Sequence, residues 1–143
     1  MSHNKNILLC AYACEPNKGS EPEVGWKTAV YLASEDKESC YTVITRKNNK
    51  INIEKEVVPD NLFFIYYDLS NFLLTIKKKG NLVRIYYYLW MLGATLKLWK
   101  KRNEFSVIHH ITFVNDWLPS LFIFLKTKNN SFIWGPIGSH SQI

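Results

Sequence analysis

The sequence predicts an α/β domain built on an open, mostly parallel, Rossmann-like sheet with helices on both faces. Short runs rich in β-branched and aromatic residues alternate with segments whose apolar residues recur every three or four positions. The first run is almost continuously apolar, which is typical of a strand buried on both faces. The 143 residues, 47% apolar and 21% charged, are enough for one globular domain with its own core.

The first half of the chain is expected to supply three strands, over residues 6–13, 41–45 and 61–67. A polar turn over 15–22 separates the first strand from a helix over 23–34. The apolar spacing of that helix runs through Val24, Thr28, Tyr31 and Leu32. A weaker helix over 47–57 joins the second strand to the third, with Ile51, Ile53 and Val57 as its apolar residues.

The second half begins with residues 70–81, for which we expect a loop or a short helix. A long helix over 82–102 should then pack through one stripe, formed by Leu82, Ile85, Leu89, Leu92, Leu96 and Trp99. A fourth strand over 107–111 leads to a helix over 116–126, with Pro119 in its first turns, where proline is tolerated. A fifth strand over 131–134 runs into the turn Gly135-Pro136-Ile137-Gly138.

The formal charge of +6 favours an anionic partner: membrane lipid, a phosphorylated substrate or nucleic acid. The alternative is a solvated basic face without a partner. Nucleic acid is the least favoured of the three, because no nucleic-acid-binding motif is present and the aromatic residues have the spacing of a helical core.

The three cysteines, Cys10, Cys14 and Cys40, show no pairing scheme, which indicates a reducing, cytoplasmic environment. No second Cys/His pair completes a zinc set, and no metal site is predicted. The N-terminal apolar stretch is too short for a signal peptide, and the longest uncharged apolar stretch, 85–96, is short of a bilayer span. We therefore expect a cytoplasmic domain that does not cross a membrane.

Ligands of open parallel sheets bind beyond the carboxyl ends of the strands. The residues at these positions form a polar rim. They are Glu15 to Pro22, with Gly19, Ser20 and Glu21, after the first strand, Arg46 and Lys47 after the second, Asp68 after the third, His109, His110 and Thr112 at the fourth, and Gly135 to His140 after the fifth. Gly19 and Ser20 offer backbone amides to an anion near the start of a helix. The alternative is that Gly19 only permits a tight turn, since neither G-x-G-x-x-G nor G-K-[ST] is present.

His109 and His110 are adjacent in a strand, so their side chains must point to opposite faces. One is expected to face the cleft, where it could hydrogen-bond a sugar hydroxyl or stabilise a developing charge, and the other to pack under a helix. The alternative for either is a core histidine with satisfied hydrogen bonds. The long helix is apolar nearly all round over 85–92 and basic in its second half. Its lysines suit an anionic membrane interface, and for its apolar residues we expect the sheet to cover one face and a neighbouring domain the other.

The ordered series of segments resembles the N-terminal domain of glycosyltransferases of family four, retaining enzymes with the GT-B fold of two Rossmann-like domains. The segments that carry the resemblance are ILLCAYACEP (7–16), KGSEP (18–22), VGW (24–26), TR (45–46), YYD (66–68), YYYLW (86–90), VIHHITF (107–113) and WGPIG (134–138). The sequence departs from the family's pattern after Gly138, where Ser139 and His140 replace a glycine and an acidic residue.

The resemblance implies that residues 1–143 form an acceptor-binding domain. It implies that Gly19 and Ser20 face the donor phosphates and the acceptor, and that His109 or His110 serves catalysis. It implies that Gly135, Pro136 and Gly138 line the interdomain cleft. From their positions at the strand ends, Glu21, Arg46, Asp68 and Thr112 are expected to bind substrate on the same rim. The reaction would move a sugar from a nucleotide sugar, the co-substrate, to a glycan or lipid-linked acceptor of bacterial surface polysaccharide synthesis, without a cofactor.

Because the sequence stops eight residues after Gly135, where a helix would normally follow, we expect it to lack the C-terminal nucleotide-sugar domain and to transfer no sugar alone. The alternative function is a non-catalytic binding or assembly module that uses the same cleft.

Overall fold

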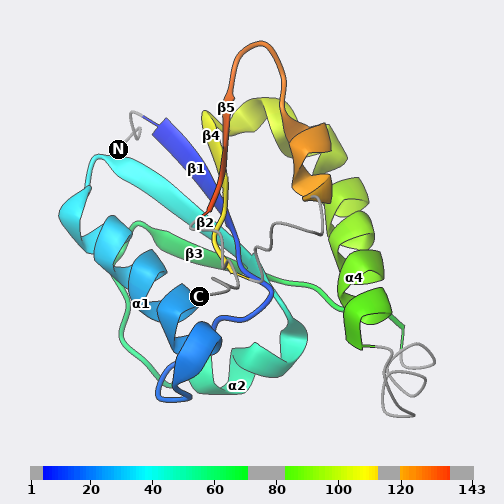
Figure 1. Cartoon of the computed structure of the whole chain (residues 1–143). Helices are drawn as coiled ribbons and strands as arrows, with labels where there is room; N and C mark the ends of the chain where they lie inside the picture. The colour runs from blue at the N-terminus through cyan, green and yellow to red at the C-terminus, as the bar shows by residue number, and fades with distance from the viewer. Residues whose placement is uncertain (1–4, 71–82, 113–119, 136–143) are drawn as a thin grey trace, which may run out of the picture.

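The computed structural model of the chain describes residues 5–70, 83–112 and 120–135. Its centre is a five-stranded sheet in which all neighbouring strands are parallel, in the order β3-β2-β1-β4-β5 (Figure 1). The strands are β1 (Lys5–Cys10), β2 (Ser39–Thr45), β3 (Leu62–Tyr66), β4 (Val107–His110) and β5 (Ser131–Trp134). This all-parallel sheet with helices confirms the predicted α/β, Rossmann-like fold class.

Strand β1 lies in the middle of the sheet because it is apolar on both faces. Leu9 is opposite Val43 of β2 and His109 of β4, and the side chains of Leu8 and Leu9 are completely buried. A strand with helices on both sides has no solvated face, so it needs no alternation of polar residues. The predicted run 6–13 continues past Cys10 as a buried loop and not as a strand.

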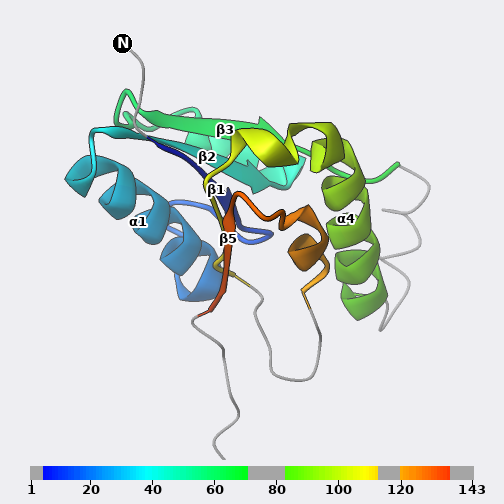
Figure 2. The same ribbon diagram turned by 90° about the horizontal axis from the view of Figure 1, so that it is seen from above.

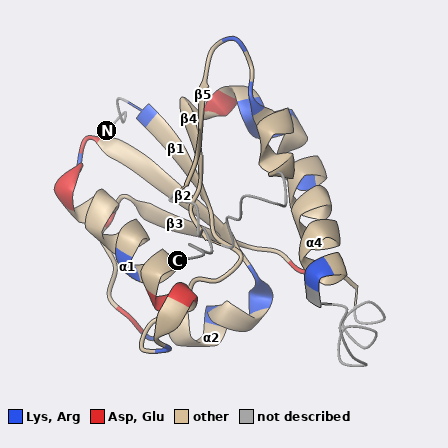
Figure 3. Cartoon of the chain, viewed as in Figure 1, with Lys and Arg blue, Asp and Glu red and all other residues tan. Residues whose placement is uncertain are grey.

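The two faces of the sheet carry two separate cores (Figure 2). Helix α1 (Ser20–Glu35) covers one face, over the alternate side chains of β1 that include Leu9. Helix α4 (Val83–Leu98) and the 3₁₀ turn η3 (Leu121–Leu125) cover the other face, over Leu8 and Cys10. Charged residues are confined almost entirely to helices and loops around the sheet (Figure 3).

Helix α1 approaches the sheet through small residues, which corrects the predicted apolar face. Gly25, Ala29 and Ala33 are buried, whereas Val24 and Tyr31 are 50% and 64% exposed. A Cβ atom at Gly25 would overlap the Ala13 carbonyl oxygen, so the helix backbone lies directly on the loop after β1. At this short separation only small side chains fit directly between the helix and the sheet, so the larger Val24 and Tyr31 lie on the exposed side.

Helix α1 begins three residues earlier than predicted, at Ser20. Pro22 falls in its first turn, where a missing amide proton costs nothing, and Glu21 and Glu23 favour the positive end of the helix. Pro22, predicted as the last residue of the turn, is therefore part of the helix.

The prediction that helix α4 packs on the sheet through the stripe over 85–99 is wrong, because the residues of that stripe lie on the outer side of the helix. Ile85, Leu96 and Trp99 are exposed, while the residues under the helix are Tyr86, Tyr87, Trp90, Met91, Ala94 and Leu98. Both sides of this helix are apolar, so periodicity alone cannot say which side faces the sheet. Hydrogen bonds decide it: the Trp90 indole donates to the Tyr67 carbonyl oxygen at 2.8 Å.

Two other predicted helices are not continuous α-helices in the described residues. The segment 47–57 contains a 3₁₀ turn, η1 (Lys47–Asn49), and one turn of helix, α2 (Lys50–Ile53). The described part of the segment 116–126 contains the 3₁₀ turn η3. A further 3₁₀ segment, η2 (Trp99–Glu104), continues α4. The predictions for residues 71–82, among them Leu82 of the stripe, and for residues 116–119, with Pro119, lie outside the described residues. No helix within the described ranges is long and apolar enough to cross a bilayer.

Candidate functional site at the carboxyl edge of the sheet

The strand order reverses at β1, and the reversal defines where a ligand is expected. The chain passes from β1 to β2 on one side and later returns to β4 on the other. The crevice between β1 and β4, beyond their carboxyl ends, is therefore the topological switch point of the sheet. The segments that border it are the loop 11–19, the N-terminus of α1 and residues 111–112 after β4.

The loop after β1 folds back tightly before α1 begins. Asn17, Gly19 and Ser20 all have positive φ, at 61°, 72° and 55°. Gly19 is the N-cap residue of α1 and makes no side-chain cap, so the first amides of the helix are left to other acceptors. The glycine therefore serves the turn, and the same turn presents the positive end of the helix at the switch point.

Thr112 and Gly135, also predicted as substrate-binding, are used by the fold itself. Thr112 is completely buried, and its hydroxyl accepts a hydrogen bond from the Ala13 amide at 3.2 Å. The Gly135 amide donates to the His110 carbonyl oxygen at 3.2 Å, and its φ of 148° is one that favours glycine. Both residues shape the rim, and Pro136 and Gly138 lie outside the described residues.

His110 packs under helix α4 and is 1% exposed. The Tyr87 hydroxyl lies 2.9 Å from Nε2, and the Ser120 hydroxyl lies 2.8 Å from Nδ1. In the neutral ring these distances fit Tyr87 donating to Nε2 and Nδ1–H donating to Ser120. Burial lowers the pKa of His110 to about 4, so the ring is neutral at neutral pH.

His109 points to the opposite face of the sheet, as the strand geometry requires, and is half-buried. Its Nε2–H donates to the Gly135 carbonyl oxygen at 2.8 Å. That bond fixes the tautomer with Nδ1 as the acceptor, and Nδ1 has no hydrogen-bond partner among the described residues. Burial lowers the pKa of His109, which keeps this acceptor available near neutral pH.

The buried histidine predicts a loss of stability in mild acid. The unfolded chain takes up a proton near the ordinary histidine pKa of 6.5, whereas folded His110 does so only at about 4. Stability from His110 is therefore complete above pH 6.5 and is lost as the pH falls to about 4, by on the order of 2–3 kcal/mol.

Urea unfolding of the wild type and of His110→Gln across this pH range measures the effect. Carboxylates titrate in both proteins, so the difference between the two curves isolates the histidine. The free energy of unfolding should fall more steeply in the wild type, and parallel curves would contradict the prediction.

Arg46 and Asp68, predicted from the ends of two strands, form an ion pair with Nε 3.4 Å from Oδ1. Their side chains are only 10% and 6% exposed. The Arg46 guanidinium lies over the Tyr12 and Tyr86 rings, 5.0 and 5.1 Å from the ring centroids. The Tyr86 hydroxyl and the Leu69 amide both donate to the same Asp68 oxygen.

Tyrosines join these residues into one network along the carboxyl edge, on the α4 face. The Tyr12 ring lies under Arg46 and also packs edge-on against Tyr87, with 5.0 Å between ring centroids. Tyr87 in turn contacts His110. The network thus runs from Asp68 after β3 to His110 in β4. Burial raises the pKa of the Tyr87 hydroxyl, and Cys10 and Glu21 raise it further.

The tyrosines of this network were not predicted as site residues, although the sequence contains a signal for them. A buried tyrosine normally needs a hydrogen-bond partner for its hydroxyl, and Tyr86 and Tyr87 stand among apolar residues in a helix that faces a sheet. Their partners come from other strand ends and are far away in the sequence. Asn52 was also not predicted: its side-chain amide donates to the carboxylate of Glu15, a residue of the predicted rim, at 2.5 Å.

In the part of the chain that the structure describes, no three His, Cys, Asp or Glu side chains are grouped to hold a metal ion. A hollow of about 620 Å³ lies at the opposite end of the sheet, between Ser34, Lys37 and residues 58–61, and holds none of the predicted site residues. Comparison of the chain with protein family models, with curated proteins and with solved structures gives no match.

Proposed function

We propose that the chain is the acceptor-binding, N-terminal domain of a retaining glycosyltransferase with the GT-B fold. In this proposal it binds a glycan or lipid-linked acceptor of bacterial surface polysaccharide synthesis at the switch point between β1 and β4. A second domain holds the nucleotide sugar. The proposal rests on the resemblance of the ordered sequence segments together with one structural observation: the start of α1, residues 111–112 after β4 and Gly135 after β5 lie at the same edge of the sheet.

The two histidines receive different roles. His110 has both ring nitrogens occupied and no exposed surface to offer, so its role is to hold the network under α4. His109 is half-buried on the other face, and its Nδ1 is an acceptor. In the proposed reaction Nδ1 of His109 therefore accepts a hydrogen bond from the acceptor hydroxyl and takes up its proton as that oxygen bonds to the anomeric carbon. The bond from the same carbon to the nucleoside diphosphate breaks, and the diphosphate leaves.

The start of α1 is suited to the negative charge of the reaction. The sugar leaves a nucleoside diphosphate, which carries charge that develops further in the transition state. Backbone amides after Gly19 and the positive end of α1 can stabilise such charge without reorganisation. The acidic Glu21 and Glu23 oppose an anion at this point, so the diphosphate would have to approach the amides and not the helix side chains.

Turnover is the test of this function. The protein should be expressed from its complete reading frame and assayed with a panel of nucleotide sugars against lipid-linked acceptors. We expect transfer of one sugar with the anomeric configuration retained, and a kcat reduced about 100-fold or more in His109→Ala. His109→Gln is the matched variant, since its amide can still donate toward Gly135 but cannot take up a proton.

Each outcome addresses a different part of the proposal. Wild-type turnover in both His109 variants would remove the histidine assignment and leave the glycosyltransferase. Binding of acceptor without transfer of any sugar in the panel would instead favour the non-catalytic module.

A further inference from the structure

The outer side of helix α4 carries a continuous apolar stripe. It is formed by Ile85, Leu89, Leu92, Leu96 and Trp99, which we call the outer stripe, with exposed fractions from 37% to 66%. These residues are three or four positions apart and so follow one line along the helix. Single exposed apolar residues are common on soluble domains, but five in a row mark a contact surface.

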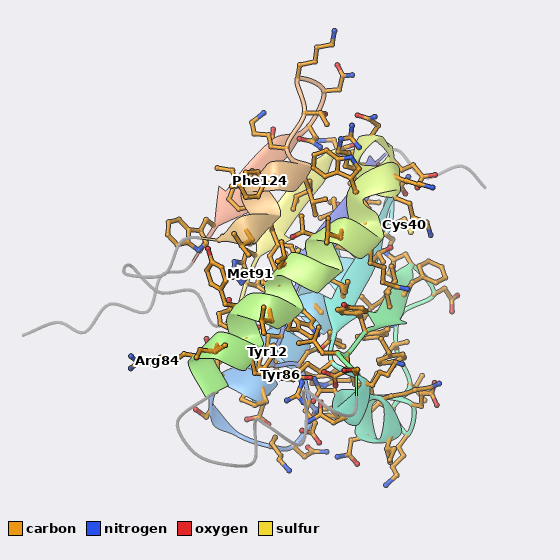
Figure 4. The ribbon with its side chains drawn as sticks, turned by 90° about the vertical axis from the view of Figure 1, so that its right-hand side faces the viewer. Tyr12, Cys40, Arg84, Tyr86, Met91 and Phe124 are labelled. Atoms are coloured by element: carbon orange, nitrogen blue, oxygen red, sulfur yellow. The ribbon has the colours of Figure 1, made fainter. Side chains whose placement is uncertain are left out.

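The apolar surface extends beyond the outer stripe at the N-terminal end of α4 and onto the neighbouring segment η3. At its N-terminal end a shallow hollow of about 270 Å³ is lined by Arg84, Ile85, Tyr88 and Leu89. Beside the helix, η3 exposes Ile123 and Phe124 (Figure 4). Segment η3 is held against α4 by the edge-on packing of Phe122 on Trp90, so the two segments form one surface.

The charge beside the outer stripe is predominantly positive. Lys97, Lys100 and Lys101 are exposed beside its C-terminal half, and Arg84 is exposed beside its start. The Arg102 guanidinium stacks on the Trp99 ring at 4.1 Å from the centroid. No acidic residue occurs between positions 83 and 103, and the exposed Glu104 ends η2.

We propose that the outer stripe of α4 binds the surface of an anionic phospholipid bilayer. The apolar side chains would enter the boundary between headgroups and acyl chains, with Trp99 at the level of the headgroups, and the lysines would contact lipid phosphates. The surface is a convex helix with a basic border, which fits a planar anionic layer. A second copy of the chain fits poorly, because pairing two such faces would bring lysines against lysines. The inference does not depend on sugar transfer.

Sedimentation with vesicles tests the surface directly. The protein is mixed with vesicles of phosphatidylcholine alone, or with about 30% phosphatidylglycerol, at low and at physiological salt. We expect binding to the anionic vesicles, weakened by salt and weak or absent on phosphatidylcholine. The double variant Leu89→Glu/Leu96→Glu should bind on the order of 100-fold more weakly, and Lys100→Gln/Lys101→Gln on the order of tenfold more weakly.

Tyr31→Glu is the matched control, because Tyr31 is 64% exposed on α1, which covers the other face of the sheet. It should bind like the wild type, and thermal unfolding of each variant verifies its fold. Three results would overturn the proposal: no binding to anionic vesicles at low salt, equal weakening by Tyr31→Glu, or a dimer in light scattering that Leu89→Glu/Leu96→Glu converts to a monomer.

Discussion

Replacing Asp68 by alanine is expected to lower the free energy of unfolding by about 3–5 kcal/mol. The reason is the charge that it leaves behind. Arg46 is enclosed between Tyr12 and Tyr86, and Asp68 is the acidic group that pairs with it in the described structure. The variant would also remove the acceptor of the Tyr86 hydroxyl. Domains of this kind are stable by only about 5–15 kcal/mol, so Asp68→Ala should be close to unfolding at 37 °C.

A double variant separates the ion pair from simple loss of packing. Arg46→Met/Asp68→Leu removes both charges and keeps much of the volume, so it should be considerably more stable than Asp68→Ala. Glu54→Ala is the surface control, because the Lys50–Glu54 pair, at 3.8 Å, is more than half exposed and should contribute less than about 1 kcal/mol. Urea unfolding of the four proteins checks the order. Equal stability of Asp68→Ala and wild type would show that the pair carries no structural role.

Replacing His110 by alanine is expected to cost about 3–5 kcal/mol, and replacing His109 about 1 kcal/mol. His110→Ala leaves a cavity between Tyr87 and Phe122 and removes one hydrogen-bond partner from each of two buried hydroxyl groups, those of Tyr87 and Ser120. His109→Ala removes one hydrogen bond to a carbonyl oxygen at a half-buried position.

The same pair of variants separates structure from function. His110→Ala should lose activity in proportion to its unfolded fraction, and stabilising conditions should restore it. His109→Ala should stay folded and lose turnover. Thermal unfolding measured beside kcat distinguishes these cases. A fully stable His110→Ala that is inactive would contradict the structural role given to His110.

The strands and their order of appearance were predictable, because each is a short apolar run between polar turns. Residues 41–45 and 131–134 were placed within two residues of the strands found, and the helix after the first strand was found with its start displaced by Pro22. Local patterns carry this information because strand and helix periods differ.

The facing of the helices was not predictable, since it depends on partners far away in the sequence. In α1 the short distance to the Ala13 carbonyl oxygen selects small residues such as Gly25 for the buried side. In α4 both sides are apolar, and the side with Trp90 and Tyr87 is buried because their polar atoms find Tyr67 and His110 there. The apolar spacing of a helix in the sequence gives neither its distance from the sheet nor the hydrogen-bond partners of its side chains.

The sequence predicted which residues stand at the strand ends of the candidate site, but not which of them are buried or which contact one another. The carboxyl-end rule named Arg46, Asp68 and both histidines from the sequence alone. It could not assign His110 to the core, because a histidine's hydrogen bonds to Tyr87 and Ser120 arise only when α4 and η3 pack on the sheet.

The central claim is that the acceptor binds at the switch point between β1 and β4. An NMR titration of the ¹⁵N-labelled protein with a water-soluble, short-chain polyprenyl diphosphate sugar tests it most directly. We predict that the amide signals that shift are those of Gly19, Ser20, Ile111 and Gly135. Shifts confined to the hollow at Ser34, or no shifts at millimolar ligand, would contradict the claim.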